Sequence, residues 1–477
     1  MNAGDGHGPV RLWTGRVLLI GLGTAVVPLD SAVNIAFPDI TASFGLEVQS
    51  IQWVVICYVL THAGLMLAFG RIGDMFGHAA VFRLGLLCSA AAFLLCAAAP
   101  SYGWLLAFRV VQGVGAALVL SCGPALVTGL FPEAQRSRVL GIYTMLFAVG
   151  SALGPSLGGV LVQLWGWSAV YWFRAPIALL ALLLLRGLPA APRPATREPF
   201  DMVGAGLLAL TLAAMLLTLT QLQRVGQQEY GPLLLAALAL AALAGFVRHE
   251  ARFPRPIVEI GLFRRPGFAL VNAANVLTNL ASFAVMLLAP YYLVRMTGLP
   301  LLVCGLLLAA GPVGTMAASP LAGWVIGRLP PQRVALLGAA LASAGLFAVT
   351  GWDAGTGVAA IVLPLFLQGF GLGLFQVAYM DIVTGTIARH DRGVAGSLAM
   401  VTRTLGIVAG ATLLALSFQS IEAAALAEGQ DATESFLTGF RATFLLAAAL
   451  PAAVAVAMAL GRGTRKAARA GGRPGEG

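Results

Sequence analysis

Asp30 is the clearest candidate for chemistry in this sequence, because it lies in the stretch PLDSAVNIAFPDI, inside an otherwise apolar segment. A charged side chain at the centre of a bilayer costs about 3 kcal/mol on insertion scales, so such residues usually face a cavity and serve a function. A poorly hydrated carboxylate can bind and release protons near neutral pH. The sequence therefore predicts a proton or cation site at Asp30, with a structural acid bonded to helix ends or to arginine as the alternative.

Further charged residues lie inside other apolar segments, among them Arg109, Arg174 and Arg403. A guanidinium does not lose its proton in proteins and must find acceptors or water. Each of these arginines is therefore either a functional ligand or a bracket that holds two helices through backbone carbonyls. Asp381 also has two interpretations. It is a second proton site or an attraction for a cationic substrate, or else an interfacial acid near basic loop residues.

Amide side chains are the best candidates for the polar lining of a substrate cavity, since amides in lipid need hydrogen-bond partners. These amides are Asn34, Gln112, Gln368 and Gln376. Arg174, Asp381 and Arg403 complete the predicted cavity.

The elements that must position these residues are membrane-spanning helices. Of the 477 residues, 59% are hydrophobic and only 10% are charged, and the mean hydropathy is +0.89. Soluble proteins carry about 25% charged residues, so the solvent around this chain is largely lipid. A helix needs about 20 apolar residues to cross a bilayer. Windows of this kind occur near 15–37, 50–70, 79–99, 103–129, 138–163, 168–187, 202–222, 231–247, 268–294, 301–326, 333–351, 357–386, 393–418 and 437–460, which predicts fourteen spans.

The net charge of +10 reflects topology rather than nucleic-acid binding, because the basic residues gather in short loops on one side of the predicted spans. The opposite loops contain few arginines and several acids, notably Glu422, Glu428, Asp431 and Glu434. The positive-inside rule then predicts that both termini are cytoplasmic, which an even number of spans requires. We expect a multi-pass protein of the bacterial plasma (inner) membrane.

The second half of the chain repeats the first at a nearly constant offset. GRIGDMFGHAAVFRLG (70–85) aligns with GWVIGRLPPQRVALLG (323–338), and GSALGP (150–155) aligns with GIVAGA (406–411). Gln112 aligns with Gln368 in the same way, and Ser282 is the approximate counterpart of Asp30 in the repeat. Spans 1–6 and 9–14 are therefore predicted to form two parallel six-helix bundles, as in a major facilitator transporter. The predicted parts are a bundle at 1–190, a linker with two inserted spans at 191–264, and a bundle with a basic tail at 265–477.

The motifs and their order resemble the fourteen-helix drug:proton antiporter branch of the major facilitator superfamily. PLDSAVNIAFPDI resembles the first-helix signature of that branch, GRIGDMFGH its loop between spans 2 and 3, and AFRVVQGVGAAL its span 4 element. GSALGPSLGGVL resembles its antiporter signature in span 5, and PFDMVGAGLLAL and PIVEIGLFRRPGFA are similar to its segments around the inserted helices. Together these motifs cover both halves of the chain.

The resemblance implies proton coupling by Asp30 and Arg109, with alternating access between the two bundles. It implies a conformational latch at Gly70, Asp74 and Gly77, whose acid we expect at a helix N-terminus of the other half. It also implies an antiporter gate, in which small residues let span 5 bend and approach another helix closely. The gate residues are Gly150, Gly154, Pro155, Gly158 and Gly159.

The sequence departs from this branch in the latch and in span 6. Met75 follows Asp74 where the branch usually has arginine, and His78-Ala79 replaces its usual basic pair. In GWSAVYWFRAP, Ser168 stands in place of arginine and Arg174 in place of asparagine. We therefore expect a weaker latch and an altered substrate cavity.

The sequence predicts no enzyme, no catalytic residue, no cofactor and no metal site. It has no P-loop motif, and its five cysteines lie in apolar segments without metal-ligand spacing. We predict a monomeric, proton-coupled exporter of small amphipathic or cationic organic compounds, whose partners are substrate, protons and lipid but no nucleic acid. The alternative is a transporter of a specific endogenous metabolite, including an anionic one bound by Arg174 and Arg403. A minor alternative is a non-transporting membrane sensor or scaffold.

Overall fold

The computed structural model describes residues 8–46, 51–187, 201–221, 230–254, 256–257, 260–353, 355–388 and 391–470. All regular elements in these residues are helices, which confirms the predicted all-α class. The chain divides into two compact units. Unit 1 comprises Met1–Ile260 and Val383–Val401, and unit 2 comprises Gly261–Ile382 and Thr402–Gly477. The three-part division at 1–190, 191–264 and 265–477 remains a prediction.

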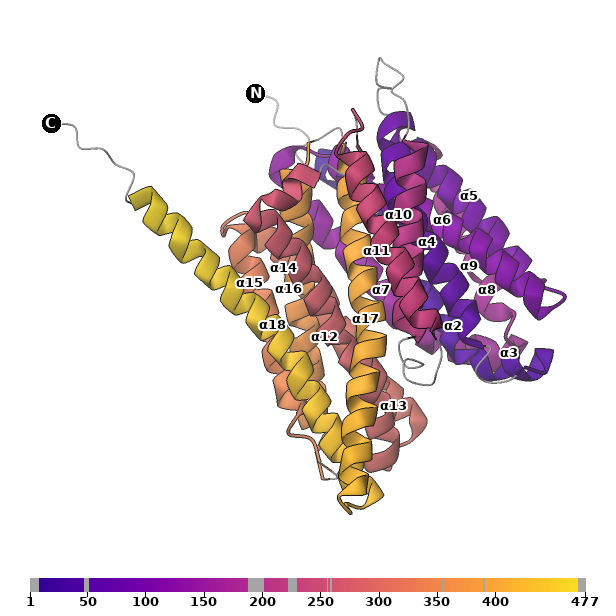
Figure 1. Ribbon diagram of the computed structural model, residues 1–477. Helices are drawn as coiled ribbons and strands as arrows, with labels where there is room; N and C mark the ends of the chain where they lie inside the picture. The colour runs from indigo at the N-terminus through magenta and orange to yellow at the C-terminus, as the bar shows by residue number, and fades with distance from the viewer. Residues whose placement is uncertain are drawn as a thin grey trace, which may run out of the picture. The chain divides into compact units, whose positions relative to one another are not determined.

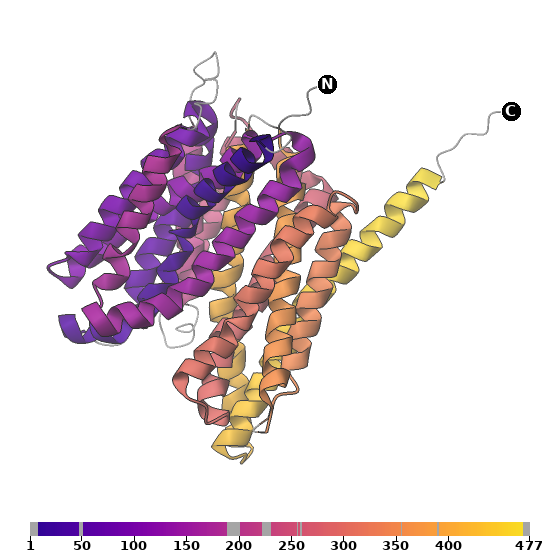
Figure 2. The ribbon, with the colours of Figure 1, turned by 180° about the vertical axis from the view of Figure 1, so that it is seen from behind.

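Unit 1 begins with a first span that is broken into short pieces and continues with long helices. Its elements are α1 (Gly8–Ala25), η1 (Pro28–Ser31), α2 (Ala32–Ile35), α3 (Phe37–Phe44), α4 (Gln52–Phe76), α5 (His78–Ala97), α6 (Tyr102–Gly129), η3 (Glu133–Gln135), α7 (Arg136–Trp165), α8 (Ala169–Trp172), α9 (Arg174–Leu184), η4 (Leu185–Gly187), α10 (Met202–Gln221) and α11 (Gly231–Glu250). Within this unit α1 packs along α7, and the pair is visible from behind in Figure 2.

Unit 2 is built from the second set of long helices. Its elements are η6 (Ile260–Arg264), α12 (Pro266–Met296), α13 (Leu301–Leu308), α14 (Ala310–Val325), α15 (Pro331–Val349), α16 (Val358–Thr386), α17 (Arg392–Ala427) and α18 (Ala432–Ala470). The last turn of α16 and the first turns of α17 belong to unit 1. The aromatic rings of Tyr292, Trp352 and Phe440 stack in the core of unit 2, with centroids 4.8 Å and 5.1 Å from Tyr292.

Thirteen helical segments in the described part of the chain are long and apolar enough to cross a membrane. The predicted sixth span, 168–187, contains two shorter helices, α8 and α9, because the helix is interrupted at Phe173. The predicted number of fourteen is therefore not confirmed by helix length. Large apolar side chains such as Leu234 (69%) and Leu240 (68%) stay exposed, as expected for helices surrounded by lipid.

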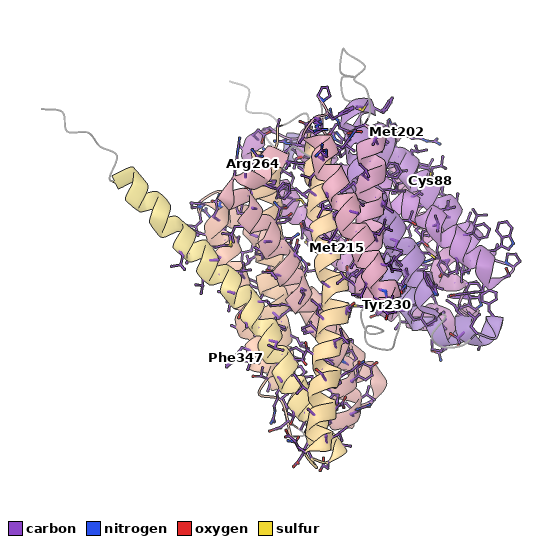
Figure 3. All side chains as sticks on the ribbon, in the orientation of Figure 1. Cys88, Met202, Met215, Tyr230, Arg264 and Phe347 are labelled. Carbon is purple, nitrogen blue, oxygen red and sulfur yellow. The ribbon has the colours of Figure 1, made fainter. Side chains whose placement is uncertain are left out.

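The two inserted helices α10 and α11 lie side by side, and α10 packs against α4 (Figure 1). Asp201 precedes α10, and its Oδ1 accepts a hydrogen bond from Gly204 N at 2.7 Å and lies 2.8 Å from His249 Nε2 of α11. The carboxylate therefore caps one helix and joins it to the other. Met202 and Tyr230 project from the exposed surface of this pair (Figure 3). The first residues of the predicted linker at 191–264 lie outside the described residues, since the structure describes none of 188–200.

Candidate functional site

A break in the first span places Asp30 away from regular helix geometry. Pro28 has no N–H, so the α-helical bonding pattern cannot continue through it. Val27 N instead bonds to Thr24 O at 3.1 Å and Asp30 N to Val27 O at 3.0 Å, both with the three-residue spacing of a 3-10 turn. The turn η1 thus presents the Asp30 side chain toward α6 and α9, where its bonding partners lie.

Arg109 and Gln112 of α6 bind the Asp30 carboxylate. Arg109 makes a bidentate ion pair, with Nη1 2.7 Å from Oδ1 and Nη2 2.9 Å from Oδ2. Gln112 Nε2 donates to the same Oδ1 at 2.8 Å, while its Oε1 accepts from Arg109 Nη1 at 2.8 Å. Arg109 Nε donates to Val54 O of α4 at 2.7 Å, which fixes the guanidinium between two helices.

Arg174, the first residue of α9, binds the same carboxylate. Its Nη1 lies 2.7 Å from Asp30 Oδ1, and its Nε donates to Val170 O at 3.0 Å. Both guanidiniums are fully buried, and each lies over an aromatic ring. Arg109 lies 4.5 Å from the centroid of Tyr58, and Arg174 lies 4.4 Å from that of Phe93. We refer to Asp30, Arg109, Gln112 and Arg174 as the Asp30 cluster.

The Asp30 cluster carries one negative and two positive charges. Among the described residues, Arg109 and Arg174 form ion pairs with Asp30 only, which leaves a net charge of +1. The carboxylate accepts four hydrogen bonds, three at Oδ1 and one at Oδ2. In this conformation Asp30 is therefore an acid bonded to arginine. Its side chain nevertheless keeps 14% of its surface accessible, so small species can reach it.

The predicted gate residues divide into two groups on α7. Gly150, Gly154 and Gly158 are buried against the first span, where added β-carbons would collide with Ala25, Ser31 and Ala32. These three glycines therefore allow close contact between α7 and the broken span that holds Asp30. Pro155 is exposed, and the position of a β-carbon on Gly159 has no neighbour within 4 Å among the described residues.

The predicted latch acid, Asp74, lies at the N-terminus of α17. Its Oδ1 accepts from Gly393 N at 2.8 Å and its Oδ2 from Val394 N at 3.3 Å, within unit 1. This position suits a carboxylate, because the first N–H groups of a helix have no partner within the helix and carry the positive end of its dipole. His78 Nε2 lies 2.8 Å from the same Oδ1, so an imidazole occupies the place of the usual basic residue.

The two latch glycines meet different requirements. A β-carbon at Gly70 would collide with Ser397 and with the backbone of Gly393, so glycine permits α4 and α17 to approach. Gly77 ends α4 at φ +94°, a conformation that favours glycine. Two ion pairs, Arg71–Asp391 and Arg392–Glu133, also hold the start of α17 within unit 1.

Unit 2 contains a buried network of uncharged polar side chains around Gln376. Gln376 Nε2 donates to Asn275 Oδ1 at 3.1 Å and to Asn279 Oδ1 at 3.2 Å. Asn275 Nδ2 donates to Thr402 Oγ1 at 2.9 Å, and Tyr379 OH lies 3.0 Å from the same oxygen. Tyr379 also donates to Asn272 Oδ1 at 2.9 Å. We refer to these six residues of α12, α16 and α17 as the amide network.

Most of the amide network was missed by reasoning from the sequence. Asn272, Asn275 and Asn279 repeat at i, i+3 and i+7 on α12, so they share one helix face in an apolar span. That stripe was a usable signal, because buried amides need partners. Tyr379 and Thr402 had no comparable signal.

The remaining predicted cavity residues are distributed over both units. Asn34 is exposed on α2, Asp381 is buried on α16, and Arg403 is half-buried on α17 beside Thr402. Gln368 of α16 donates to Ser282 Oγ of α12 at 2.9 Å. Of the predicted cavity residues, Gln112 and Arg174 are the ones that bind Asp30.

A groove between α15 and α18 is a poor alternative site. It is lined mostly by alanines, together with Ser343 and Phe347, which is labelled in Figure 3, and it contains no ionisable side chain. Ser343 Oγ donates to Ala448 O at 2.7 Å and so ties the two helices together. Its lining suits lipid contact better than recognition of a polar ligand.

A family model and known proteins match most of this chain. The family model described as the Major Facilitator Superfamily matches residues 19–411 and also residues 274–477. The chain is 32% identical over 406 residues to the uncharacterized transporter YebQ of Escherichia coli, covering 84% of this chain and 88% of YebQ. It is 28% identical over 400 residues to the multidrug resistance protein Stp of Mycobacterium tuberculosis, covering 83% and 74% of the two chains.

Two further proteins that this chain resembles are named for other kinds of cargo. The riboflavin transporter RibZ of Clostridioides difficile is 25% identical over 406 residues, which cover 84% of this chain and 87% of RibZ. The crystal structure of the human organic anion transporter MFSD10 matches with a TM-score of 0.66 at 18% identity, covering 93% and 98% of the two chains. At that identity the structural match shows a shared fold and nothing about substrates.

Proposed function

Because the chain belongs to the Major Facilitator Superfamily, we propose that it is a proton-coupled efflux transporter. It exchanges small amphipathic organic compounds, cations included, for protons by alternating access between two six-helix bundles. Similarity to a multidrug resistance protein supports export of foreign compounds. Similarity to a riboflavin transporter supports a wider range of organic cargo. The protein acts in a bacterial plasma membrane as a monomer with both termini in the cytoplasm.

The observation that carries this proposal is the Asp30 carboxylate, which is bonded to two buried arginines and keeps part of its surface accessible. Protonation removes the negative charge that pairs with both Arg109 and Arg174, and it turns one oxygen of the carboxyl group into a donor. The contact of η1 with α6 and α9 then loses its main attraction. Proton binding is thereby linked to a change in helix arrangement. Arg109 is the main partner in this step, because it makes two bonds to the carboxylate.

We assign cargo binding to unit 2 rather than to the surroundings of Asp30. The two guanidiniums leave the Asp30 cluster with net positive charge, which repels a cation. The amide network offers donors and acceptors without such a charge, and Gln368, Asp381 and Arg403 lie in the same unit. Neutral and amphipathic compounds with hydrogen-bonding groups suit this environment.

The latch and the gate have mechanical roles in the proposed cycle. Asp74 stabilises one conformation while it caps α17, and its release from Gly393 accompanies the switch to the other. The close contact of Gly150, Gly154 and Gly158 with the first span seals the protein against leak during that change.

Transport in proteoliposomes tests the proposal. Vesicles that contain the full chain and a trapped pH-sensitive dye should acidify or alkalinise when a cationic dye or a neutral drug is exchanged across the membrane. Asp30→Asn should abolish this coupled proton movement, and Asp30→Glu should retain part of it because the carboxylate is kept. Unchanged proton movement in Asp30→Asn would show that Asp30 takes no part in the mechanism. Cargo movement that does not depend on the proton gradient would refute proton exchange.

A further inference from the structure

The charges within the Asp30 cluster do not cancel. One carboxylate faces two guanidiniums, and it accepts four hydrogen bonds, three of them at Oδ1. A single positive charge therefore remains without a counter-charge among the described residues. An uncompensated charge away from water is unfavourable, so a site of this kind favours an additional anionic partner.

The unused hydrogen-bond donors lie on Arg174 and beside it. Arg109 uses Nε, Nη1 and Nη2, whereas Arg174 Nη2 has no hydrogen-bond partner among the described residues. Tyr171 OH is likewise buried without a partner in the described part of the chain. The Tyr171 ring lies 5.5 Å from the Arg174 guanidinium carbon, and the two residues are one helical turn apart. A buried donor without a partner destabilises the fold, and a charged donor does so more strongly.

We propose that Arg174 Nη2 and Tyr171 OH form a subsite for a monovalent anionic group. One negative charge neutralises the cluster, which matches a halide or a carboxylate better than a divalent anion. Phe93, whose ring covers Arg174 at 4.4 Å, keeps the surroundings apolar and thereby strengthens the attraction for an anion. The anion is either a small inorganic ion such as chloride or an acidic group of the cargo.

Anion binding at this subsite is linked to protonation of Asp30. A proton on Asp30 removes the negative charge that competes for Arg174, so the proton and the anion promote each other's binding. Chloride should therefore shift the pH midpoint of proton-coupled transport to higher pH. If the acidic group belonged to the cargo, proton and cargo would bind together rather than in exchange. The subsite rests on the geometry of the cluster and does not depend on the exchange mechanism proposed above.

Thermal unfolding of the detergent-purified full chain tests the subsite. Sodium chloride is titrated while ionic strength is held constant with sodium sulfate, and a second titration uses sodium benzoate. We expect a saturable rise in the midpoint with at least one of the two anions. Arg174→Asn should abolish the response, and Tyr171→Phe, which removes only the hydroxyl, should weaken the apparent affinity about tenfold. Arg328→Asn is the matched control, since Arg328 lies over Trp324 in unit 2.

Each outcome has a defined meaning. A response to chloride alone identifies an inorganic ion, and a response to benzoate, alone or in competition with chloride, identifies an acidic group of the cargo. Both support the subsite, although the second contradicts proton exchange as the transport mechanism. No response in the wild-type chain, or an equal response in Arg174→Asn, overturns the proposal. Loss of coupled transport in Asp30→Asn is measured separately and bears on the proposed function alone.

Discussion

Gln368 Nε2 donates a hydrogen bond to Ser282 Oγ at 2.9 Å, at the positions that the internal repeat pairs with Gln112 and Asp30. Gln112 Nε2 donates to Asp30 Oδ1 at 2.8 Å in the same way. In each unit, therefore, the fourth span of the repeat (α6 or α16) donates a hydrogen bond to the first span. Only unit 1 has a carboxylate there, which is why its contact becomes part of an ionic cluster.

Replacement of Gln112 and of Gln368 should lower the stability of the protein by unequal amounts. Hydrogen bonds to charged groups contribute about 1.5–3 kcal/mol, and bonds between neutral groups about 0.5–1.5 kcal/mol. Gln112→Leu should therefore lower the free energy of unfolding by about 2 kcal/mol, and Gln368→Leu by about 1 kcal/mol. Reversible unfolding in mixed micelles measures both values. Equal losses, or a larger loss for Gln368→Leu, would contradict the ionic character of the Asp30 site.

The two arginines of the cluster should differ in their effect on stability. Arg109→Gln removes a bidentate ion pair and the bond to Val54 O, and should cost about 3 kcal/mol. Arg174→Gln leaves Asp30 and Arg109 as a neutral pair, so its cost should be about 1 kcal/mol or less. Thermal unfolding of the two purified variants provides the comparison. An Arg174 variant as unstable as the Arg109 variant would show that the excess positive charge is compensated.

Adjacent glycines in α7 should respond differently to an added methyl group. A β-carbon at Gly158 would lie 2.9 Å from Ala32 Cα, so Gly158→Ala should push α7 away from α2 and cost about 1–3 kcal/mol. Gly159→Ala meets open space and should be neutral or slightly stabilising, because alanine favours helix. Melting temperature and transport rate are both measured. Similar losses in the two variants would refute the assignment of the sealing face.

The proposed latch at Asp74 predicts a local change in hydrogen exchange. Asp74→Asn removes the charge at the start of α17, a stabilisation of about 1 kcal/mol, so the amides of Gly393 and Val394 should exchange about fivefold faster. Mass spectrometry of the peptide that contains both residues provides the measurement. Glu133→Gln is the control, because Glu133 binds the Arg392 side chain at the same helix start. Faster exchange in the control, with none in Asp74→Asn, would assign the latch to that ion pair.

Several features of the protein could be predicted from the sequence because they are properties of single helices or of aligned motifs. High hydropathy and low charge identify a membrane protein, since no soluble core could bury so many apolar side chains. The internal repeat pairs Gln112 with Gln368, and each of the two contacts the first span of its half of the chain. Asp30, Arg109 and Arg174 could be identified as candidate functional residues because each lies alone in an apolar segment, and a charged side chain in lipid is costly.

Only the tertiary structure decided which of these groups meet. Arg174 is 144 residues from Asp30, and whether its guanidinium reaches that carboxylate depends on how α9 packs beside η1. The same applies to Gly150, Gly154 and Gly158, which face the first span, and to the asparagine stripe of α12, which meets Tyr379. Periodicity along a helix reports the average environment of its faces. Which side chains bind one another depends on contacts between different helices, and these contacts are determined by how the folded chain packs.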